Sequence, residues 1–328
     1  MSLAEHLAKN IFQNSVASEP IRSGFGRGLL AAGKADERVV ALCADLTGST
    51  KMDLFAKEFP ERFVQIGVAE QNLVTVASGM AKMGKLPFAS SYAAFNPGRN
   101  WEQIRTTICL AEQPVNVVGS HAGISVGPDG ATHQMLEDIA LTRVLPNMVV
   151  VCPGDAIEAE KATRALAEDD MHPSYLRLAR EATPVFTTDK SPFDLHKAHV
   201  LRKGSDITLI GTGTMSYQLL KAAHLLEKDN IDAEVVHVPV VKPLDQATIL
   251  ASARKTGKVV TAEEAQINGG FGSAVCEVLS EHYPVPVKRI GMQDRFGESG
   301  EPNELLKHFG LNALSMVDTI KVFLKENS

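Results

Sequence analysis

The sequence is poor in the residues that build disulfide frameworks and membrane spans. Its 328 residues include only four cysteines, which are scattered and form no Cys-x-x-Cys pair. We therefore expect buried free thiols, as in the reducing cytoplasm, and neither disulfides nor a zinc site. The N-terminal 20 residues have no apolar export segment, and no stretch approaches the ~18 continuous apolar residues of a membrane helix. These absences predict a cytoplasmic protein that contacts no membrane.

An excess of positive charge is also absent. Lysine and arginine number 33 against 39 aspartates and glutamates, so the formal net charge is −6. This charge provides no bulk attraction for nucleic acid, which is not expected as a partner. The phosphate-loop pattern G-x-x-x-x-G-K-[S/T] is missing too, which argues against a nucleoside triphosphatase.

The residues that are present predict an α/β protein with mostly parallel sheets. Short apolar runs recur along the chain and are typical of strands covered on both faces. They are RVVALCADL, RFVQIGV, PVNVVGS, NMVVVCPGD, DITLIGTG, AEVVHVPVV, GKVVTAEEA and VPVKRIGM. Helical patterns lie between them, for example at residues 157–167 and 216–228. In such folds ligands bind beyond the carboxyl ends of the strands.

A change in composition at residues 183–205, where proline, threonine, serine and glycine gather, predicts a connector between two domains. We expect an N-terminal arm at residues 1–19, a first domain at 20–188, a linker at 189–204 and a second domain at 205–328. The arm is expected to lie outside the first sheet and to serve in subunit contact.

The most informative segment is the glycine-rich loop at residues 119–134, directly after an apolar run. Its four glycines allow tight turns and close approach to a ligand, while His121, Asp129 and His133 supply donors and acceptors. Loops after parallel strands are where such groups meet a substrate. The alternative is a long surface loop whose histidines satisfy only nearby backbone groups.

Two further segments offer groups that suit a planar ligand. Glu70 stands at the start of a predicted helix, where a half-buried carboxylate can bond to a ring nitrogen. The helix dipole alone would also explain an acid at that position. Tyr92 and Phe95 lie three residues apart in a chain with 5% aromatic residues. They suit stacking on a heteroaromatic ring, although core packing is the commoner use of such residues.

Taken in order, several segments resemble the pyrimidine-binding domain of transketolase, a thiamine diphosphate enzyme. They are Ala44-Asp45-Leu46, Ile66-Gly67-Val68-Ala69-Glu70-Gln71-Asn72, Ser91-Tyr92-Ala93-Ala94-Phe95 and Asp129-Gly130-Ala131-Thr132-His133-Gln134. Segments at residues 237–245, 261–264 and 268–274 are similar to the family's C-terminal domain. The resemblance covers roughly residues 20–325 and implies the C-terminal subunit of a split, two-chain transketolase.

The resemblance also implies what a partner must provide. A full-length transketolase has an additional N-terminal domain, in which a Gly-Asp-Gly motif and a later asparagine hold a divalent cation against the coenzyme's phosphates. No such motif occurs in this sequence. The resemblance therefore implies a separate N-terminal subunit that binds the diphosphate and Mg²⁺ or Ca²⁺, and an α2β2 heterotetramer with a homodimer contact. No metal ligand is expected in this chain.

Roles at the coenzyme follow from the same resemblance. Glu70 would bond to the ring nitrogen N1′ of thiamine diphosphate, and Phe95 and Tyr92 would pack on the aminopyrimidine ring. Asp45 would lie near the thiazolium side, where a carboxylate stabilises positive charge.

The resemblance assigns the remaining candidates to the sugar phosphate. Asp129 and His133 would contact hydroxyl groups near the reacting carbonyl, with His121 toward the donor, and His133 could also move a proton. The phosphate would be held by Arg22, Ser49, Arg180 and His121. An ion pair between Arg180 and Glu181 is the structural alternative.

The activity implied is transfer of a two-carbon ketol unit from a ketose phosphate to an aldose phosphate. Deoxyxylulose phosphate synthase shares a similar loop, but it normally carries both halves in one long chain. The beta subunit of a 2-oxo acid dehydrogenase has a similar length and depends on a partner, but its usual loop lacks the pattern of residues 129–134. A different class of function is a catalytically silent subunit that only braces an assembly.

Overall fold

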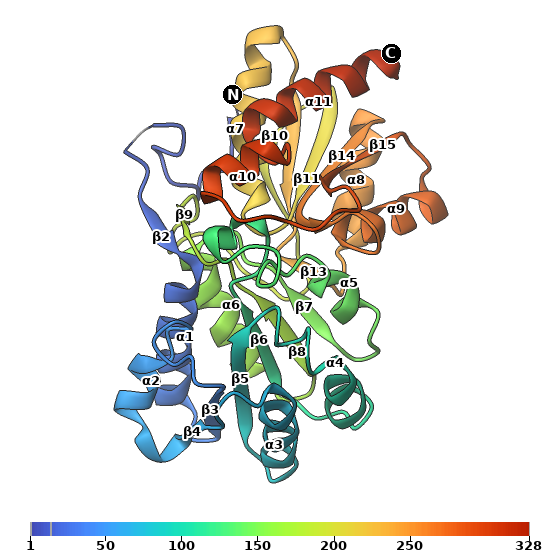
Figure 1. Cartoon of the computed structure of the whole chain (residues 1–328). Helices are drawn as coiled ribbons and strands as arrows, with labels where there is room; N and C mark the ends of the chain where they lie inside the picture. The colour runs from blue at the N-terminus through green and yellow to red at the C-terminus, as the bar shows by residue number, and fades with distance from the viewer. Residues whose placement is uncertain (1, 14, 328) are drawn as a thin grey trace.

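The computed structural model describes residues 2–13 and 15–327, which form two sheets covered by helices, with the C-terminal half above the first half in Figure 1. The first sheet has seven strands and the second has six. A short antiparallel ribbon joins β2 (Ser18–Pro20) to β9 (Ala182–Pro184). The predicted α/β class with mostly parallel sheets is confirmed.

The first sheet is parallel except at one edge, where β13 runs antiparallel to β7. In spatial order its strands are β13 (Val240–Lys242), β7 (Val149–Val151), β8 (Ser174–Arg177), β6 (Asn116–Ser120), β5 (Leu86–Tyr92), β3 (Val39–Cys43) and β4 (Phe63–Gln65). Five of the predicted apolar runs contribute to this sheet, because AEVVHVPVV extends into β13. Strands β5 and β8 were not among the predicted runs, since their sequences LPFASSY and SYLR contain polar residues.

The second sheet is parallel in its centre and antiparallel where β1 and β10 join it. Its strands are β1 (Ser2–Leu3), β10 (His199–Lys203), β12 (Ala233–His237), β11 (Ile207–Gly211), β14 (Val259–Gln266) and β15 (Val287–Met292). The central strands β11, β12 and β14 are almost entirely buried and begin with mostly apolar residues, which explains why the sequence pattern found them.

Helices connect the strands as expected for parallel sheets. In the first half they are α1 (Ile21–Ala35), α2 (Asp53–Glu58), η1 (Pro60–Arg62), α3 (Glu70–Lys82), α4 (Trp101–Gln103), η2 (Ile104–Cys109), η3 (Ile124–Asp129), α5 (Asp138–Arg143) and α6 (Ala156–Glu168). In the second half they are α7 (Met215–Leu226), η4 (Glu227–Asp229), α8 (Gln246–Thr256), α9 (Phe271–His282), α10 (Pro302–His308) and α11 (Ala313–Glu326).

Helices α1 and α6 pack closely because α1 has glycine at the contact. A Cβ atom on Gly24 would lie 1.8 Å from the carbonyl oxygen of Ala156, so only glycine fits there. Helix α6 begins at an Asp155 cap whose carboxylate accepts from the backbone N–H of Glu158 at 3.0 Å. This packing fixes the start of α1, where the candidate residue Arg22 lies.

The two sheets exchange strands between the halves of the chain. The predicted N-terminal arm adds β1 to the second sheet, and its Leu7 and Ile11 are buried in the core of that domain. Tyr217 on α7 donates its hydroxyl hydrogen to the Ile11 carbonyl oxygen at 2.7 Å. In return, β13 from the second half joins the first sheet beside β7. The predicted division into domains remains a prediction, but sheet membership does not follow it at these two strands.

A continuous apolar core joins the two halves. One cluster contains Leu42 and Val117 from the first sheet together with Ile210 and Val236 from the second, all buried. Burial of apolar area at such a contact stabilises one arrangement of the domains at about 25 cal/mol per Å². We therefore treat the relative position of the domains as part of the fold.

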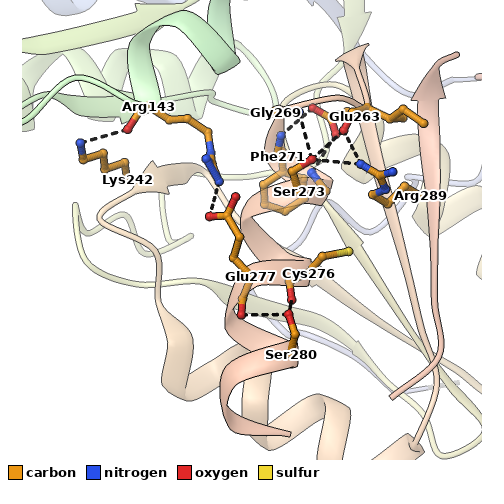
Figure 2. Close-up of polar contacts among 12 residues, drawn as sticks. Arg143, Lys242, Glu263, Gly269, Phe271, Ser273, Cys276, Glu277, Ser280 and Arg289 are labelled. Atoms are coloured by element: carbon orange, nitrogen blue, oxygen red, sulfur yellow. Dashed lines mark hydrogen bonds and ion pairs between the residues drawn. The ribbon is translucent and has the colours of Figure 1, made fainter. Parts of the chain in front are cut away.

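Polar contacts also connect the two halves of the chain. Arg143 at the end of α5 pairs with Glu277 of α9 at 2.5 Å, and Lys242 of β13 donates to the Arg143 carbonyl oxygen at 3.0 Å (Figure 2). Nearby, the buried Glu263 accepts from the backbone N–H groups of Phe271 and its neighbour at 2.7 Å, which holds the first turn of α9 (Figure 2).

The helices and the cysteines also bear on membrane spans and disulfides. No helix among residues 2–13 and 15–327 is both long and apolar enough to cross a membrane. Cys43, Cys109 and Cys152 are buried and Cys276 is half-buried, and all four thiols are free.

Candidate active site

The candidate residues gather at the carboxyl ends of neighbouring strands in the first sheet. Asp45 follows β3, Tyr92 ends β5, His121 follows β6 and Arg180 follows β8. The chain leaves β3 toward β4 on one side and later returns as β5 on the other. Such a reversal opens a crevice at the carboxyl ends of the two strands, which is where α/β proteins bind ligands.

One end of this region, which we call the ring end, consists of Glu70, Phe95 and Arg99. Helix α3 begins at Glu70, as expected, and the Glu70 side chain is only 2% exposed. The Asn100 side chain holds the first residue of α3 by donating to the Glu70 carbonyl oxygen at 2.9 Å. A surface hollow of about 390 Å³ lies beside Glu70 and Arg99. The carboxylate is thus buried in the protein but reachable from a cavity.

Arg99 is a residue of this end that sequence reasoning missed. Its Nη1 donates to Oε2 of Glu70 at 2.9 Å, and its guanidinium carbon lies 4.6 Å from the centre of the Phe95 ring. Within the described ranges, Oε1 of Glu70 has no hydrogen-bond partner. The sequence offered a weak signal only, since a basic residue in a Gly-Arg-Asn turn is usually a solvated surface charge.

Aromatic rings connect the ring end to the other end of the site. The Phe95 ring lies 5.4 Å from His133, edge to face, and 6.4 Å from Tyr92. Tyr92 in turn stacks on His121 with ring centres 3.9 Å apart. Tyr92 and Phe95 are both half-buried, so neither is an ordinary core residue.

The opposite end, which we call the sugar end, consists of Arg22, Ser49, His121, Asp129, His133 and Arg180. Arg22 of α1 donates to the Ser49 carbonyl oxygen at 2.5 Å and to the Arg180 carbonyl oxygen at 3.1 Å. Burial and the nearby Arg180 lower the pKa of Arg22, which remains a cation because arginine does not deprotonate in proteins. Ser49 contributes its carbonyl group to this contact, whereas the sequence suggested a role for the residue in phosphate binding.

Arg180 lies between two carboxylates in this structure. Its Nη1 donates to the Val126 carbonyl oxygen at 2.6 Å and lies 3.7 Å from Oδ1 of Asp129. Its Nε lies 3.4 Å from Oε1 of Glu181, so the ion pair considered from the sequence is also present. Arg180 is thus held in place beside Asp129, with its side chain only 29% exposed.

His121 is buried and cannot supply the positive charge that we expected at the phosphate. Burial first, and then the nearby Arg22, Arg180 and His133, lower the pKa of His121 to about 3. The imidazole is therefore neutral near pH 7, and its Nδ1 is hydrogen-bonded to Oγ of Ser120 at 2.9 Å. It can donate or accept one hydrogen bond, but it does not act as a cation.

Backbone strain marks the strand ends that carry the site. Asp45 has φ 61° and His121 has φ 58°, in the left-handed region that residues other than glycine rarely adopt. Such strain costs about 1–3 kcal/mol and concentrates at functional sites. Asp45 is nevertheless separate from the other candidates: it is exposed, and its backbone N–H donates to Oε1 of Gln65 at 2.7 Å.

The second domain braces the loop that carries Asp129 and His133. Gln134 is buried, and its Nε2 donates to the carbonyl oxygens of Ile124, Gly127 and Glu298 at 2.8–3.2 Å. Glu298 belongs to the segment before α10, so this bond crosses between domains. Gln134 belongs to the motif of residues 129–134, but the sequence did not indicate that it bonds to the distant Glu298.

A second brace comes from β14. The Glu264 carboxylate accepts from the Ser125 backbone N–H at 2.7 Å and from the Thr214 hydroxyl at 3.0 Å. Arg177 of β8 donates to the Glu264 carbonyl oxygen at 2.8 Å. The bonds from Ser125 and Arg177 connect η3, at the base of the loop, and β8 to β14 of the second domain.

Comparison with known proteins agrees with the fold. Residues 19–185 match the family model of the transketolase pyrimidine-binding domain, and residues 196–316 match that of the transketolase C-terminal domain. The fold and the family models therefore define a protein with a transketolase-type pyrimidine-binding domain followed by a transketolase-type C-terminal domain. More particularly, the chain belongs to the transketolase family.

Individual relatives identify the part of the enzyme that the chain represents. A Methanocaldococcus jannaschii protein with the provisional name transketolase C-terminal section is 42% identical, over 93% of this chain and 96% of that protein. A 6-deoxy-6-sulfo-D-fructose transketolase subunit from a Clostridium species is 41% identical, over 88% of this chain and 89% of that protein.

A solved structure gives the same result. A protein described as a split gene transketolase, inactive beta4 tetramer, superposes with a TM-score of 0.87 at 44% identity, covering 93% of this chain and 98% of that one. The resemblance to the C-terminal subunit of a split transketolase, predicted from the sequence, is confirmed.

Proposed function

We propose that this chain is the pyrimidine-binding subunit of a thiamine-diphosphate-dependent enzyme that transfers a two-carbon ketol unit from a ketose phosphate to an aldose phosphate. The observation that carries the proposal is the continuous arrangement of the ring end and the sugar end along one edge of the first sheet. Glu70 and Phe95 lie at one end, Arg22 and Arg180 at the other, and the stacked rings of Tyr92 and His121 connect them.

The ring end fits the aminopyrimidine ring of thiamine diphosphate. A flat ring with nitrogen atoms at its edge needs a polar partner at that edge and an aromatic or apolar surface at its face. The Glu70 carboxylate, with one oxygen free of partners among the described residues, suits the first need. The half-buried Phe95 suits the second, and the adjoining hollow of about 390 Å³ provides an approach.

When bound, thiamine diphosphate supplies a carbon nucleophile and an electron sink, which the amino-acid side chains lack. Glu70 would hold the ring nitrogen N1′ through a shared proton, which would raise the basicity of the exocyclic amino group across the ring. The buried setting of Glu70 strengthens this interaction because water does not compete for the carboxylate. Asp45, which is exposed just after β3, would contribute negative charge on the thiazolium side.

The sugar end binds and orients the ketose. We propose that Asp129 and His133 bond to hydroxyl groups near the reacting carbonyl, and that His133 moves a proton there. The neutral His121 serves as a hydrogen-bonding group toward the donor. Arg22 and Arg180, with Ser49, bind the phosphate, since a guanidinium donates to an anion through two parallel N–H groups.

We propose that a separate N-terminal subunit binds the diphosphate and a Mg²⁺ or Ca²⁺ ion, within an α2β2 heterotetramer that also contains a homodimer contact. The absence of the Gly-Asp-Gly motif from this sequence supports this division of the site. Similarity to a protein described as a subunit supports it further. Closed two-fold assemblies of this kind are favoured among oligomers.

Reconstitution with the N-terminal subunit of a split transketolase tests the proposal. We expect ketol transfer between a ketose phosphate and an aldose phosphate only when both chains, thiamine diphosphate and Mg²⁺ are present. Calorimetric titration of thiamine diphosphate with Mg²⁺ into the lone chain and into the mixture separates the two contributions. Tight binding to the lone chain would contradict the division of the site between subunits.

The same mixture distinguishes the other activities. Condensation of pyruvate with glyceraldehyde phosphate would indicate a deoxyxylulose phosphate synthase, and oxidative decarboxylation coupled to a lipoyl protein would indicate a 2-oxo acid dehydrogenase. A mixture that binds coenzyme but supports none of these reactions would indicate an assembly subunit. Each of these results would overturn ketol transfer as the function.

A further inference from the structure

Arg99 contacts both of the groups that the proposed function assigns to the coenzyme ring. Its guanidinium bonds to Glu70 at 2.9 Å and covers the Phe95 ring at 4.6 Å. These are the two groups to which the proposed function assigns the edge and the face of the aminopyrimidine. A ring placed on Phe95 within hydrogen-bond reach of Glu70 would compete with the guanidinium for both.

The guanidinium resembles an aminopyrimidine in the properties that matter for this subsite. It is planar and delocalised, it carries N–H donors along its edge, and it stacks on aromatic faces. The Arg99 side chain therefore satisfies Glu70 and Phe95 in the same two ways that a bound ring would. A lysine could pair with the carboxylate, but it has no plane to lay on Phe95.

Arg99 is also held loosely compared with the other arginines of the site. Its side chain is 50% exposed, and within the described ranges Glu70 is the only hydrogen-bond partner of its guanidinium. Arg22 donates to two backbone carbonyl oxygens, and Arg180 to one, so their positions depend on the fold. Arg99 can swing into solvent without breaking any backbone contact.

We propose that Arg99 is an internal substitute for the coenzyme ring: it closes the ring end in the free subunit and must leave when the coenzyme binds. This inference rests on the proposed function, because it assumes that Glu70 and Phe95 receive the ring. It assigns Arg99 a regulatory contact with Glu70 and no direct part in the reaction.

The test uses a probe that needs no diphosphate site. The pyrimidine fragment 4-amino-5-hydroxymethyl-2-methylpyrimidine is titrated into the full-length chain and followed by calorimetry. Fluorescence of Trp101, the only tryptophan and two positions after Arg99, gives a second readout. The variants are Arg99→Ala, Arg99→Lys and Glu70→Gln. Arg105→Ala is the matched control, because Arg105 is exposed and, within residues 2–13 and 15–327, forms no hydrogen bond or ion pair with Glu70.

We expect Arg99→Ala to tighten fragment binding about tenfold, which corresponds to a closed arrangement populated about nine times in ten. Arg99→Lys should give an intermediate affinity, because it retains the charge and loses the stacking. Arg105→Ala should match the unmodified chain. Glu70→Gln should weaken binding in the Arg99→Ala background, where no guanidinium competes.

Other results would overturn a specific part of the argument. If Arg99→Ala leaves affinity unchanged or weakens it while Glu70→Gln weakens it, the ring subsite stands and Arg99 is not a competitor. If the fragment does not bind Arg99→Ala, or binds equally well with Glu70→Gln, the ring subsite itself is wrong, and the proposed function loses its support at Glu70.

Discussion

The ring end and the sugar end of the site are held in different ways. At the sugar end, Arg22 and Arg180 are fixed by backbone carbonyl oxygens and His121 is buried, so the chain itself determines the geometry. At the ring end, the buried Glu70 has a half-exposed side chain, Arg99, as its partner. A site whose groups are already in position loses little entropy on binding. The sugar end is therefore preorganised, whereas the ring end must exchange one partner for another.

The strongest test of this difference is removal of the carboxylate at the ring end. We expect Glu70→Gln to retain the fold and to lower kcat of the reconstituted enzyme about 100-fold or more, as is typical for loss of an acid-base group. Initial-rate measurements of ketol transfer check this, with thermal unfolding as the test of folding. Glu61→Gln, whose side chain is 71% exposed, is the control and should retain full activity. Near-normal turnover of Glu70→Gln would remove Glu70 from the mechanism.

The second test asks whether the His121 side chain at the sugar end is shielded from water as its burial indicates. Burial lowers the pKa of His121 to about 3 in the folded chain, against 6.5 for an ordinary histidine, so the unfolded chain binds the proton more readily. This lowers the free energy of unfolding as pH falls from 6.5 toward 3 and has no effect above that window. At pH 4.5 the loss is about 2–3 kcal/mol.

The variant His121→Asn should lack this loss, and asparagine tolerates the left-handed backbone at this position. Urea unfolding at pH 4.5 and pH 7.5 measures the difference for both proteins. His282→Asn changes a side chain that is 47% exposed and serves as the control. An equal pH dependence for His121→Asn and the unmodified chain would mean that His121 is open to water.

A third test concerns the brace between the domains. Gln134→Ala removes the bonds to three carbonyl oxygens, and leaving such buried groups unpaired costs about 1–3 kcal/mol of stability. We expect kcat/KM to fall about tenfold, because a loss near 1.4 kcal/mol in positioning Asp129 and His133 has that effect. Gln293→Ala, in an exposed loop, is the control. Reduced stability with unchanged kcat/KM would show that the loop does not need the brace.

The smallest expected effect is on binding of the substrate phosphate by Arg180. Arg180→Lys retains the charge and loses the two-pronged donor, so we expect KM for the phosphorylated donor to rise about fivefold, which corresponds to about 1 kcal/mol. The value of kcat should change little. The unphosphorylated ketose is the matched control substrate, and its KM should be the same for both enzymes. An equal rise for both substrates would place Arg180 away from the phosphate.

The sequence predicted the parts of the molecule that depend on local pattern. Apolar runs located β6 and the central strands of the second sheet, because buried parallel strands read as continuous hydrophobic segments. They missed β5 and β8, which flank β6 at the centre of the first sheet. The start of α3 at Glu70 and the loop after β6 were found in the same way. The family motifs then connected Glu70, Phe95 and His133, which lie far apart in sequence.

What the sequence did not reveal depends on long-range contact. The bond between Gln134 and Glu298 spans 164 residues, and nothing in either local pattern indicates it. The stacking of Arg99 on Phe95 depends on the shape of one turn. The pKa of His121 depends on burial and on three cationic or ionisable neighbours from other elements. The family resemblance assigned His121 to the phosphate, whereas the fold buries it as a neutral ring.

The exchange of β1 and β13 between the sheets has a consequence for how this chain can be divided. A protease that cut the connector near residue 190 would leave two fragments, each still carrying a strand that completes the other's sheet. Such fragments should co-migrate on a sizing column and separate only in denaturant. For the same reason, neither half expressed alone should behave as a well-formed domain, whereas mixing the two during refolding should restore the native pair.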